Sequence, residues 1–394
     1  MLSIVLLLFA SGGRETRAES NVFSDKPLTK AQKDLLDLAF DTASSIPIAP
    51  HIKDRSKTQA TVVAQCLELE QPIRAAGYIE KIADWRRGLA CADLAMYCAQ
   101  RGLENDARRC IEHANRVAET AEDWRRDRIR IRIAQVHTIL GNSEQADLLE
   151  KNVVQSETGK VSATKAKIAE SESFDEQMKE LDALVAQGNF DVTKNALHAY
   201  VLLYDRFYAS TERRSAIKNK IESSWEKIPF FIRIDVLVDL AKSALEHDDK
   251  VTALGVVNEA QTIFDKNEWP TENYIPIVAK LALVRCGAGD EQKARSDADA
   301  ARALFDEEGN TIVDIWRAGA LRPLAETYQA MGDSAAALAV YRQAVEEGVK
   351  NPNSRPRAED LSATCCSMLS SKFEPDDALW NRMRQIQSGL GKPW

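Results

Sequence analysis

The sequence predicts an all-α protein, a right-handed superhelical α-solenoid built of antiparallel helix hairpins. Three observations lead to this prediction: a spacing of small residues that recurs along the chain, apolar residues at helical intervals within the copies, and glycine or aspartate between the two halves of each copy. A single hairpin cannot bury its apolar face alone, so stacked neighbours must supply one continuous core.

The recurring pattern is a small residue, a turn residue seven positions later, and a second small residue five positions after that. Small residues let two antiparallel helices approach closely, and glycine relieves backbone strain where the first helix ends. Where copies are adjacent, they repeat every 39 to 43 residues. The copies are Ala95-Gly102-Ala107, Ala134-Gly141-Ala146, Ala282-Gly289-Ala294, Ala325-Gly332-Ala337 and, with aspartate at the turn, Ala241-Asp248-Ala253.

Residues 123–135, "DWRRDRIRIRIAQ", alternate arginine and isoleucine as a half-buried strand would. However, the apolar residues from Ile129 to Leu140 recur at i, i+4, i+7 and i+11, which is one face of a helix. We therefore predict a helix here. Arg128 and Arg132 lie on another face, where Asp127 and acidic residues of neighbouring repeats can pair with them.

The segment Leu324–Ala344, "LAETYQAMGDSAAALAVYRQA", resembles a tetratricopeptide repeat (TPR). Its small residues, tyrosines and turn glycine stand where that family places them. Leu94–Ala114 matches nearly as well, and Leu281–Ala301 matches more loosely. The period is longer than the 34 residues of that family, and the proline that ends its second helix is mostly absent. The chain is thus TPR-like, with longer connections.

This resemblance implies a concave surface, lined by the first helix of each hairpin, that binds a protein or peptide partner. The positions carried over lack the lysine and asparagine combination with which some TPR proteins hold a C-terminal carboxylate. The predicted groove residues are Met96, Ala99, Arg128, Gln135, Asp235, Lys242, Leu283, Arg322 and Glu326.

The N-terminus, "MLSIVLLLFASGGRETRAES", has a short apolar run followed by small and polar residues, which is typical of a secretory signal peptide. Residues 1–20 are therefore predicted to direct export to the periplasm or the outside. If the start is misassigned, the protein is expected in the cytoplasm. No later stretch is apolar for long enough to predict a transmembrane helix.

Two blocks of repeats are predicted, over residues 21–158 and 174–394, with a polar break or linker over 159–173 that lacks aromatic residues. The helix Leu28–Ser44, with Thr29 as its N-cap, is expected to cap the first repeat. Five tryptophans recur near the starts of repeats, and we interpret them as structural wedges between hairpins. These are Trp85, Trp124, Trp225, Trp269 and Trp316.

The 52 basic and 60 acidic residues give a formal charge of −8, which argues against a nucleic-acid partner. The seven cysteines are too few for a disulfide scaffold and are expected to be small buried residues. Cys98 and Cys110 form the one pair that could face each other across a hairpin. A metal site using Cys110, His113 and His137 would need four converging ligands and is disfavoured.

No nucleophile elbow, phosphate-binding loop or dinucleotide fingerprint occurs, so we predict no catalytic residues, cofactor or metal. The sequence favours a non-enzymatic scaffold or adaptor. Two alternatives remain open. One is an enzyme or carbohydrate-processing accessory on an α/α array, expected as a closed toroid with acidic and aromatic side chains in one pocket. The other is an envelope component that self-associates through unpaired terminal hairpins.

Overall fold

The computed structural model describes residues 23–151, 153–154, 157 and 159–394. The predicted signal peptide, residues 1–20, lies outside these residues. Every regular element in the described part of the chain is helical, which confirms the predicted all-α array of hairpins.

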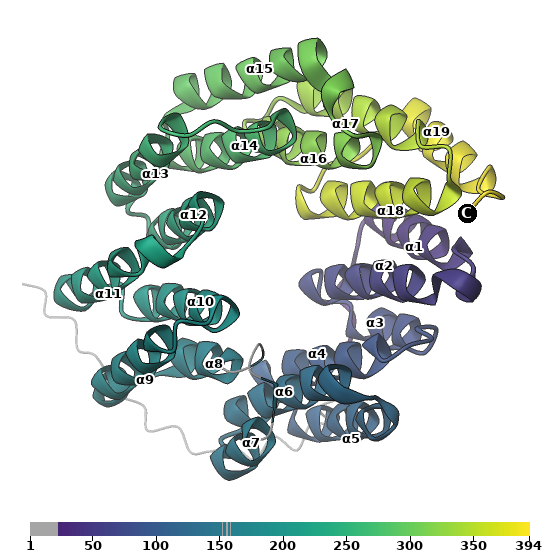
Figure 1. Cartoon of the computed structure of the whole chain (residues 1–394). Coiled ribbons are helices and arrows are strands. Elements are labelled where there is room, and N and C mark those ends of the chain that lie inside the picture. Colours follow the sequence, from purple (N-terminus) through teal and green to yellow (C-terminus); the bar gives the residue numbers. More distant parts are fainter. Residues whose placement is uncertain (1–22, 152, 155–156, 158) are drawn as a thin grey trace, which may run out of the picture.

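Every second helix of the chain belongs to an inner layer. Each inner helix packs against the next inner helix along the chain. The last inner helix, α18, packs against the first, α2, so the layer closes into a ring around a central opening (Figure 1). The inner helices of the described chain are α2 (Ile48–Glu68), α4 (Arg86–Gln100), α6 (Asp123–Ile139), α8 (Lys160–Ile168), α10 (Phe190–Arg206), α12 (Phe230–Glu246), α14 (Thr271–Ala288), α16 (Asp314–Ala330) and α18 (Ser354–Ser370).

The intervening helices form an outer layer, each packed on its hairpin partner. In the described residues, short 3-10 turns over Ser171–Ser173, Trp225–Lys227 and Gly309–Thr311 precede inner or outer helices. The outer helices are α1 (Lys30–Ser45), α3 (Pro72–Ile79), α5 (Glu104–Thr120), α7 (Ser143–Glu150), α9 (Phe174–Ala186), α11 (Thr211–Ser223), α13 (Lys250–Asp265), α15 (Glu291–Glu308), α17 (Ser334–Val349) and α19 (Asp377–Ser388).

Neighbouring inner helices run parallel, because their contacts join residues at similar distances from the two N-termini. Arg132 of α6 bonds Asp93 of α4 at 2.5 Å, and the guanidinium of Arg322 in α16 bonds Asp360 of α18 at 3.0 Å. At the junction of α18 and α2, Ser370 bonds Gln65 at 2.9 Å. The N-terminal ends of the inner helices therefore gather on one side of the ring, which we call the N-terminal rim.

The ring is closed by α1, which packs against both α2 and α18. The hydroxyl of Ser362 in α18 donates to the carbonyl of Ala39 in α1, and the hydroxyl of Thr29 donates to Glu374. The first and last hairpins thus cover each other. Self-association through unpaired terminal hairpins is therefore contradicted, because each terminal apolar face already has a partner within the chain.

The recurring small residues lie where the spacing predicted. Ala95, Ala134, Ala241, Ala282 and Ala325, on inner helices, are all fully buried. The turn residues between the helices have positive φ in each copy, at Gly102, Gly141, Gly289 and Gly332 and also at Asp248, with φ of 58°. Aspartate tolerates this left-handed conformation better than most residues do, which explains the substitution.

The helix predicted over Leu28–Ser44 is confirmed as α1. Thr29 and Gln32 form a reciprocal capping box at its N-terminus. The linker predicted over 159–173 is wrong, because α8 lies within it and packs between α6 and α10 in the inner layer. Its small side chains, including Val161 and Ala166, are fully buried, so a segment without aromatic residues still fills a core position.

Arginines near the start of several inner helices bond to carbonyls of the preceding loop. Arg233 Nε donates to the Ile228 carbonyl at 2.7 Å, and Arg317 Nε donates to the Ile312 carbonyl at 2.8 Å. Arg357 makes the equivalent bond to Asn351 at 2.5 Å. These guanidinium groups satisfy backbone acceptors that would otherwise face the N-terminal rim.

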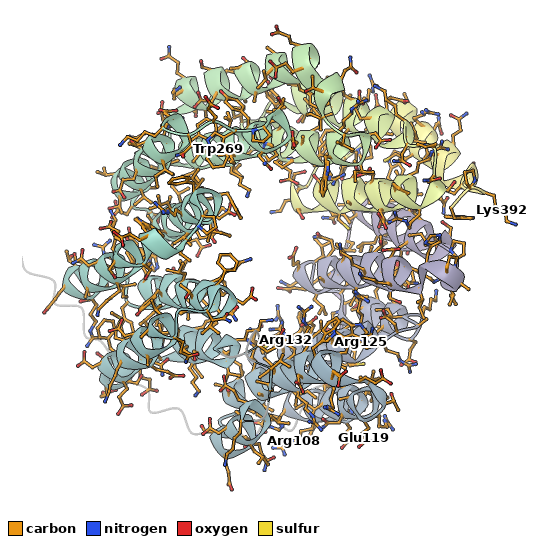
Figure 2. All side chains as sticks on the ribbon, viewed as in Figure 1. Arg108, Glu119, Arg125, Arg132, Trp269 and Lys392 are labelled. Carbon is orange, nitrogen blue, oxygen red and sulfur yellow. The ribbon has the colours of Figure 1, made fainter. Side chains whose placement is uncertain are left out.

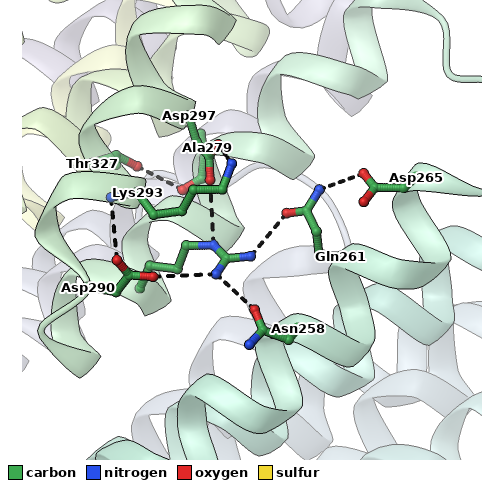
Figure 3. Close-up of polar contacts among 9 residues, drawn as sticks. Asn258, Gln261, Asp265, Ala279, Asp290, Lys293, Asp297 and Thr327 are labelled. Carbon is green, nitrogen blue, oxygen red and sulfur yellow. Dashed lines mark hydrogen bonds and ion pairs between the residues drawn. The ribbon is translucent and has the colours of Figure 1, made fainter.

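A buried arginine ties three helices together in the C-terminal half (Figure 3). Arg285 of α14 donates to Asn258 at 2.9 Å and to Gln261 at 3.2 Å, both on α13. It also lies 3.5 Å from the Asp297 carboxylate of α15. Since Arg285 is only 4% exposed, these partners replace its water shell.

The wedge interpretation holds for Trp85, Trp225 and Trp269, which are half-buried and pack against the core. The Trp269 indole donates to the Phe264 carbonyl and stacks on that ring. Trp124 is 41% exposed but packs edge-on against Trp85 of the preceding hairpin, with 5.3 Å between the ring centroids. For Trp316 the interpretation is wrong, since it is 57% exposed. Both lie in the first turn of an inner helix.

Candidate functional site

A cavity of about 650 Å³ opens on the inner surface of the ring. Five consecutive inner helices, α2 to α10, supply its walls. This volume is within the range of pockets that hold small molecules or short peptide segments. The side chains that line it include Glu68, Asp93, Met96, Tyr97, Gln100, Arg132, Gln135, Thr164, Lys167, His198 and Leu202.

A series of hydrogen bonds between side chains holds the floor of the cavity in place. Arg132 Nε donates to the Asp93 carboxylate at 2.5 Å, and Arg132 Nη1 donates to Gln135 at 3.0 Å. Gln135 in turn donates to the Lys160 carbonyl at 2.8 Å, which joins α6 to α8. Burial raises the pKa of the Asp93 carboxyl, although the neighbouring Arg132 acts in the opposite direction.

Four polar side chains on the walls make no hydrogen bond or ion pair with any other described residue. Glu68 and Gln100 stand on the α2 and α4 side, and Lys167 and His198 stand on the α8 and α10 side. The cavity thus presents Glu68 and Gln100 from one side, where Arg101 also lines it, and Lys167 and His198 from the other. Such groups are available to bond a ligand that carries both donors and acceptors.

The predicted groove residues of the N-terminal half divide into two sets. Met96 and Gln135 line the cavity. Figure 2 places Arg132 at the inner edge of the ring, with Arg108 and Glu119 outside. Ala99 is buried beneath the surface, at 8% exposure. Arg128 lies away from the cavity, near the N-terminal rim, where it pairs with Glu157 at 3.0 Å.

The remaining predicted residues lie on α12, α14 and α16, on the C-terminal half of the ring. Asp235 pairs with Lys280 of α14 at 2.7 Å, and Lys242 lies 3.6 Å from Asp239. Leu283 is half-buried on α14. These residues belong to the same inner layer as the cavity, but none of them lines it.

Glu326 has the most unusual environment of this second set. The Ser367 hydroxyl of α18 donates to its carboxylate at 2.5 Å, and the Tyr341 hydroxyl contacts Ser367 at 3.0 Å. Burial raises the pKa of Glu326, while Ser367, Arg322 and Lys242 oppose that shift. The Glu326 carboxylate is therefore held in place, but Ser367, Arg322 and Lys242 do not fully offset the cost of burying its charge.

Sequence reasoning missed Glu68, Gln100, Lys167 and His198. Helical periodicity identified the apolar face of each helix, but it could not say which polar positions turn toward the opening. One pairing did carry a sequence signal. Asp93 and Arg132 stand 39 residues apart, the offset of the repeat itself, and the prediction that Arg132 meets an acid of a neighbouring repeat is confirmed.

The cysteines are free thiols in the structure. Cys98 is buried and Cys110 is half-buried, and their side chains interact across the hairpin of α4 and α5. The contact of Cys110 with the Cys98 thiol, together with burial, raises the pKa of Cys110. Among the described residues, no group of three or more His, Cys, Asp or Glu side chains is placed to hold a metal ion.

No protein-family model and no curated protein matches this chain. A solved structure described as "Circular tandem repeat protein with novel repeat topology and enhanced subunit contact surfaces" is 16% identical and covers 91% of this chain and 94% of its own. Its TM-score is 0.29, so this similarity supports no conclusion about the present protein. None of the helices in the described residues is long and apolar enough to cross a membrane.

Proposed function

We propose that this protein is a non-enzymatic scaffold that binds a peptide or an extended protein segment inside the ring. The observation that carries the proposal is the cavity on α2 to α10, whose walls offer unpaired groups of both charges. Stacked helical hairpins commonly present such extended surfaces to partners, and the TPR resemblance of the sequence supports the same use. Fold alone does not identify the partner.

A peptide is a suitable ligand because its backbone carries donors and acceptors in alternation. Gln100 and Gln135 can each donate to and accept from such a backbone. Lys167 and His198 suit an acidic side chain or a C-terminal carboxylate, whereas Glu68 suits a basic one. Met96 and Leu202 add apolar contact area in the same cavity.

The test is selection of binders from a displayed peptide library, followed by titration of the selected peptides against variants. Gln100→Trp fills the cavity without breaking a contact, and we expect it to weaken binding at least tenfold, about 1.4 kcal/mol. Glu119→Trp, on the outer helix α5, is the matched control and should leave binding unchanged. Equal binding by both variants, or no selected peptide, would contradict the proposal.

One observation favours a second candidate function, an enzyme or carbohydrate-processing accessory. The ring is closed, as that alternative expects. The cavity brings together the carboxylates of Glu68 and Asp93 and the ring of Tyr97, on which Arg101 stacks at 3.7 Å. Asp93 is tied to Arg132, which supports a structural role for it. Turnover of an oligosaccharide panel that is lost in Glu68→Gln would favour this candidate.

We also propose that the protein is exported. Only the apolar run and small residues of positions 1–20 support this step. Expression of the full chain, cell fractionation and N-terminal sequencing of the product test it. An uncleaved product in the cytoplasm would contradict export and leave the binding proposal unaffected.

A further inference from the structure

The unpaired charges of the cavity lie at its two ends. Glu68 is the last residue of α2, the first of the five inner helices that line the cavity, whereas Lys167 and His198 lie on α8 and α10, the last two. All three residues are exposed, and none of them bonds or pairs with another residue of the described chain. Figure 1 shows α2 and α10 on opposite sides of the central opening, with α4, α6 and α8 between them. The acidic group is therefore separated from the basic groups by the length of the cavity.

The charges between these ends are already paired within the chain. Arg132 of α6 bonds the Asp93 carboxylate of α4 at 2.5 Å. Arg101, at the end of α4, pairs with Glu70 at 3.3 Å, and its guanidinium carbon lies 3.7 Å from the centre of the Tyr97 ring. These pairs leave the acid at one end and the bases at the other as the charges available to a ligand.

The middle of the cavity suits the backbone of an extended peptide. Met96 and Ile139 supply apolar contact area there, and the unpaired side-chain amide of Gln100 lies on the α4 side. An amide both donates and accepts hydrogen bonds, as a peptide backbone does. A peptide that crosses the cavity from α2 to α10 can therefore bond in its middle and place its own charged side chains at the two ends.

The number of helices between the two ends sets the length of such a peptide. The axes of packed helices lie about 8–10 Å apart. Two inner helices, α4 and α6, separate α2 from α8. Because the layer is concave, side chains from its two ends converge, so Glu68 and Lys167 stand on the order of 20 Å apart. An extended peptide rises about 3.3 Å per residue, and about six residues therefore bridge the two ends.

We propose that the cavity selects an extended peptide that carries a basic side chain and, about six residues away, an acidic side chain. This inference rests on the proposed peptide-binding function and adds the charge pattern of the ligand. The basic side chain of the peptide lies against Glu68, and the acidic side chain lies between Lys167 and His198. Pairing at both ends fixes the register of the peptide, because sliding it along the cavity breaks both contacts.

The test starts from peptides selected on the protein from a displayed library. They are synthesised with acetylated and amidated ends, so that only side chains carry charge. We expect the selected peptides to share a Lys or Arg and an Asp or Glu about six positions apart. A peptide of the same composition with these two residues adjacent should bind about tenfold more weakly, because only one end of the cavity can then be paired.

Double-mutant cycles between protein and peptide assign each contact. Glu68→Gln should remove the preference for the basic side chain, and Lys167→Gln the preference for the acidic one, each by about threefold or more. The crossed combinations should show no coupling. Glu119→Gln on α5 and Lys179→Gln on α9 are the matched controls, since both residues are exposed and lie outside the cavity. Thermal unfolding checks that all variants are folded.

Selected peptides without this charge pattern would overturn the inference, as would cycles in which Glu68→Gln and Lys167→Gln behave like their controls. Binding that requires the free ends of the peptide would also overturn it, since the chain ends would then supply the charges. In each of these cases Gln100→Trp still weakens the selected peptides, and peptide binding itself stands. If no peptide is selected, or if Gln100→Trp has no effect, the proposed function fails and this inference fails with it.

Discussion

The hydroxyl of Ser362 in α18 donates a 3.1 Å hydrogen bond to the carbonyl of Ala39 in α1, joining residues that are 323 positions apart. Both residues are buried at the seam between the first and last hairpins. This bond lies where the ring would open if the two ends of the chain separated, and it therefore reports directly on closure.

Replacing Ser362 with alanine is expected to cost about 1 kcal/mol of unfolding free energy, because the Ala39 carbonyl loses a buried donor. Urea unfolding measures the loss. Ser388→Ala, at the exposed end of α19, removes a local hydrogen bond of the same type and should cost less. Equal losses in the two variants would show that the seam does not contribute to global stability.

Gly88 lies at a close approach of α4 to α5 and α6. A Cβ atom at this position would lie 2.8 Å from Ile129 Cδ1 and 2.9 Å from Val117. We expect Gly88→Ala to destabilise the protein by about 1–3 kcal/mol through overpacking.

Gly255 in α13 is the matched control for Gly88, since nothing lies within 4 Å of its Cβ position. Gly255→Ala should stabilise the protein by up to about 1 kcal/mol, because alanine is the better helix former. Thermal unfolding of both variants checks the pair. Stabilisation by both would mean that α4 and α6 can move apart at no cost.

Arg285→Leu is expected to cost roughly 3 kcal/mol, since it strips Asn258, Gln261 and Asp297 of a buried cationic partner. Arg295 of α15, 38% exposed and paired with Asp333 at 2.7 Å, is the comparison. Arg295→Leu should cost less than about 1 kcal/mol. Chemical unfolding measures both, and a loss of the same size in the two variants would remove the special role assigned to Arg285.

Glu326→Gln is expected to raise the unfolding temperature at neutral pH. Burial raises the folded-state pKa of Glu326, so the folded protein holds this proton more tightly than the unfolded chain does. The stability that comes from the raised pKa is fully present below the usual glutamate pKa and is lost as pH rises through the folded value.

The advantage of Glu326→Gln should therefore disappear as the pH falls below about 4.3, the ordinary pKa of glutamate. Unfolding temperatures measured between acid and neutral pH check this, with Glu119→Gln on exposed α5 as the control. A glutamine variant that is less stable at neutral pH would show that Arg322 and Lys242 stabilise the carboxylate more than burial penalises it.

Much of the architecture was readable from local pattern. The alanine and glycine spacing located the hairpins, and the Thr29 cap located the first helix, because close helix approach and helix termini each require particular residues. The segment over 159–173 was misread because a short helix of small and polar residues, α8, carries little periodic signal. Its place in the inner layer depends on neighbours, not on its own sequence.

The candidate site was only partly predictable. Met96 and Gln135 line the cavity, whereas Ala99 is buried beneath the surface and Arg128 lies near the N-terminal rim. Periodicity defines which face of a helix is buried, but the direction of its polar residues depends on how each hairpin rotates against the next. That rotation also decides that Trp85 is half-buried and Trp124 is exposed, although both follow an aspartate and precede two arginines.

The sequence by itself determined that the chain is a helical array, where most hairpins turn, and which small residues hold them together, because these features depend on contacts within one repeat or between adjacent ones. Only the tertiary structure decided that the array closes, since closure depends on the small rotations of all repeats added together. That sum brings α18 onto α2 and assembles the cavity from five helices.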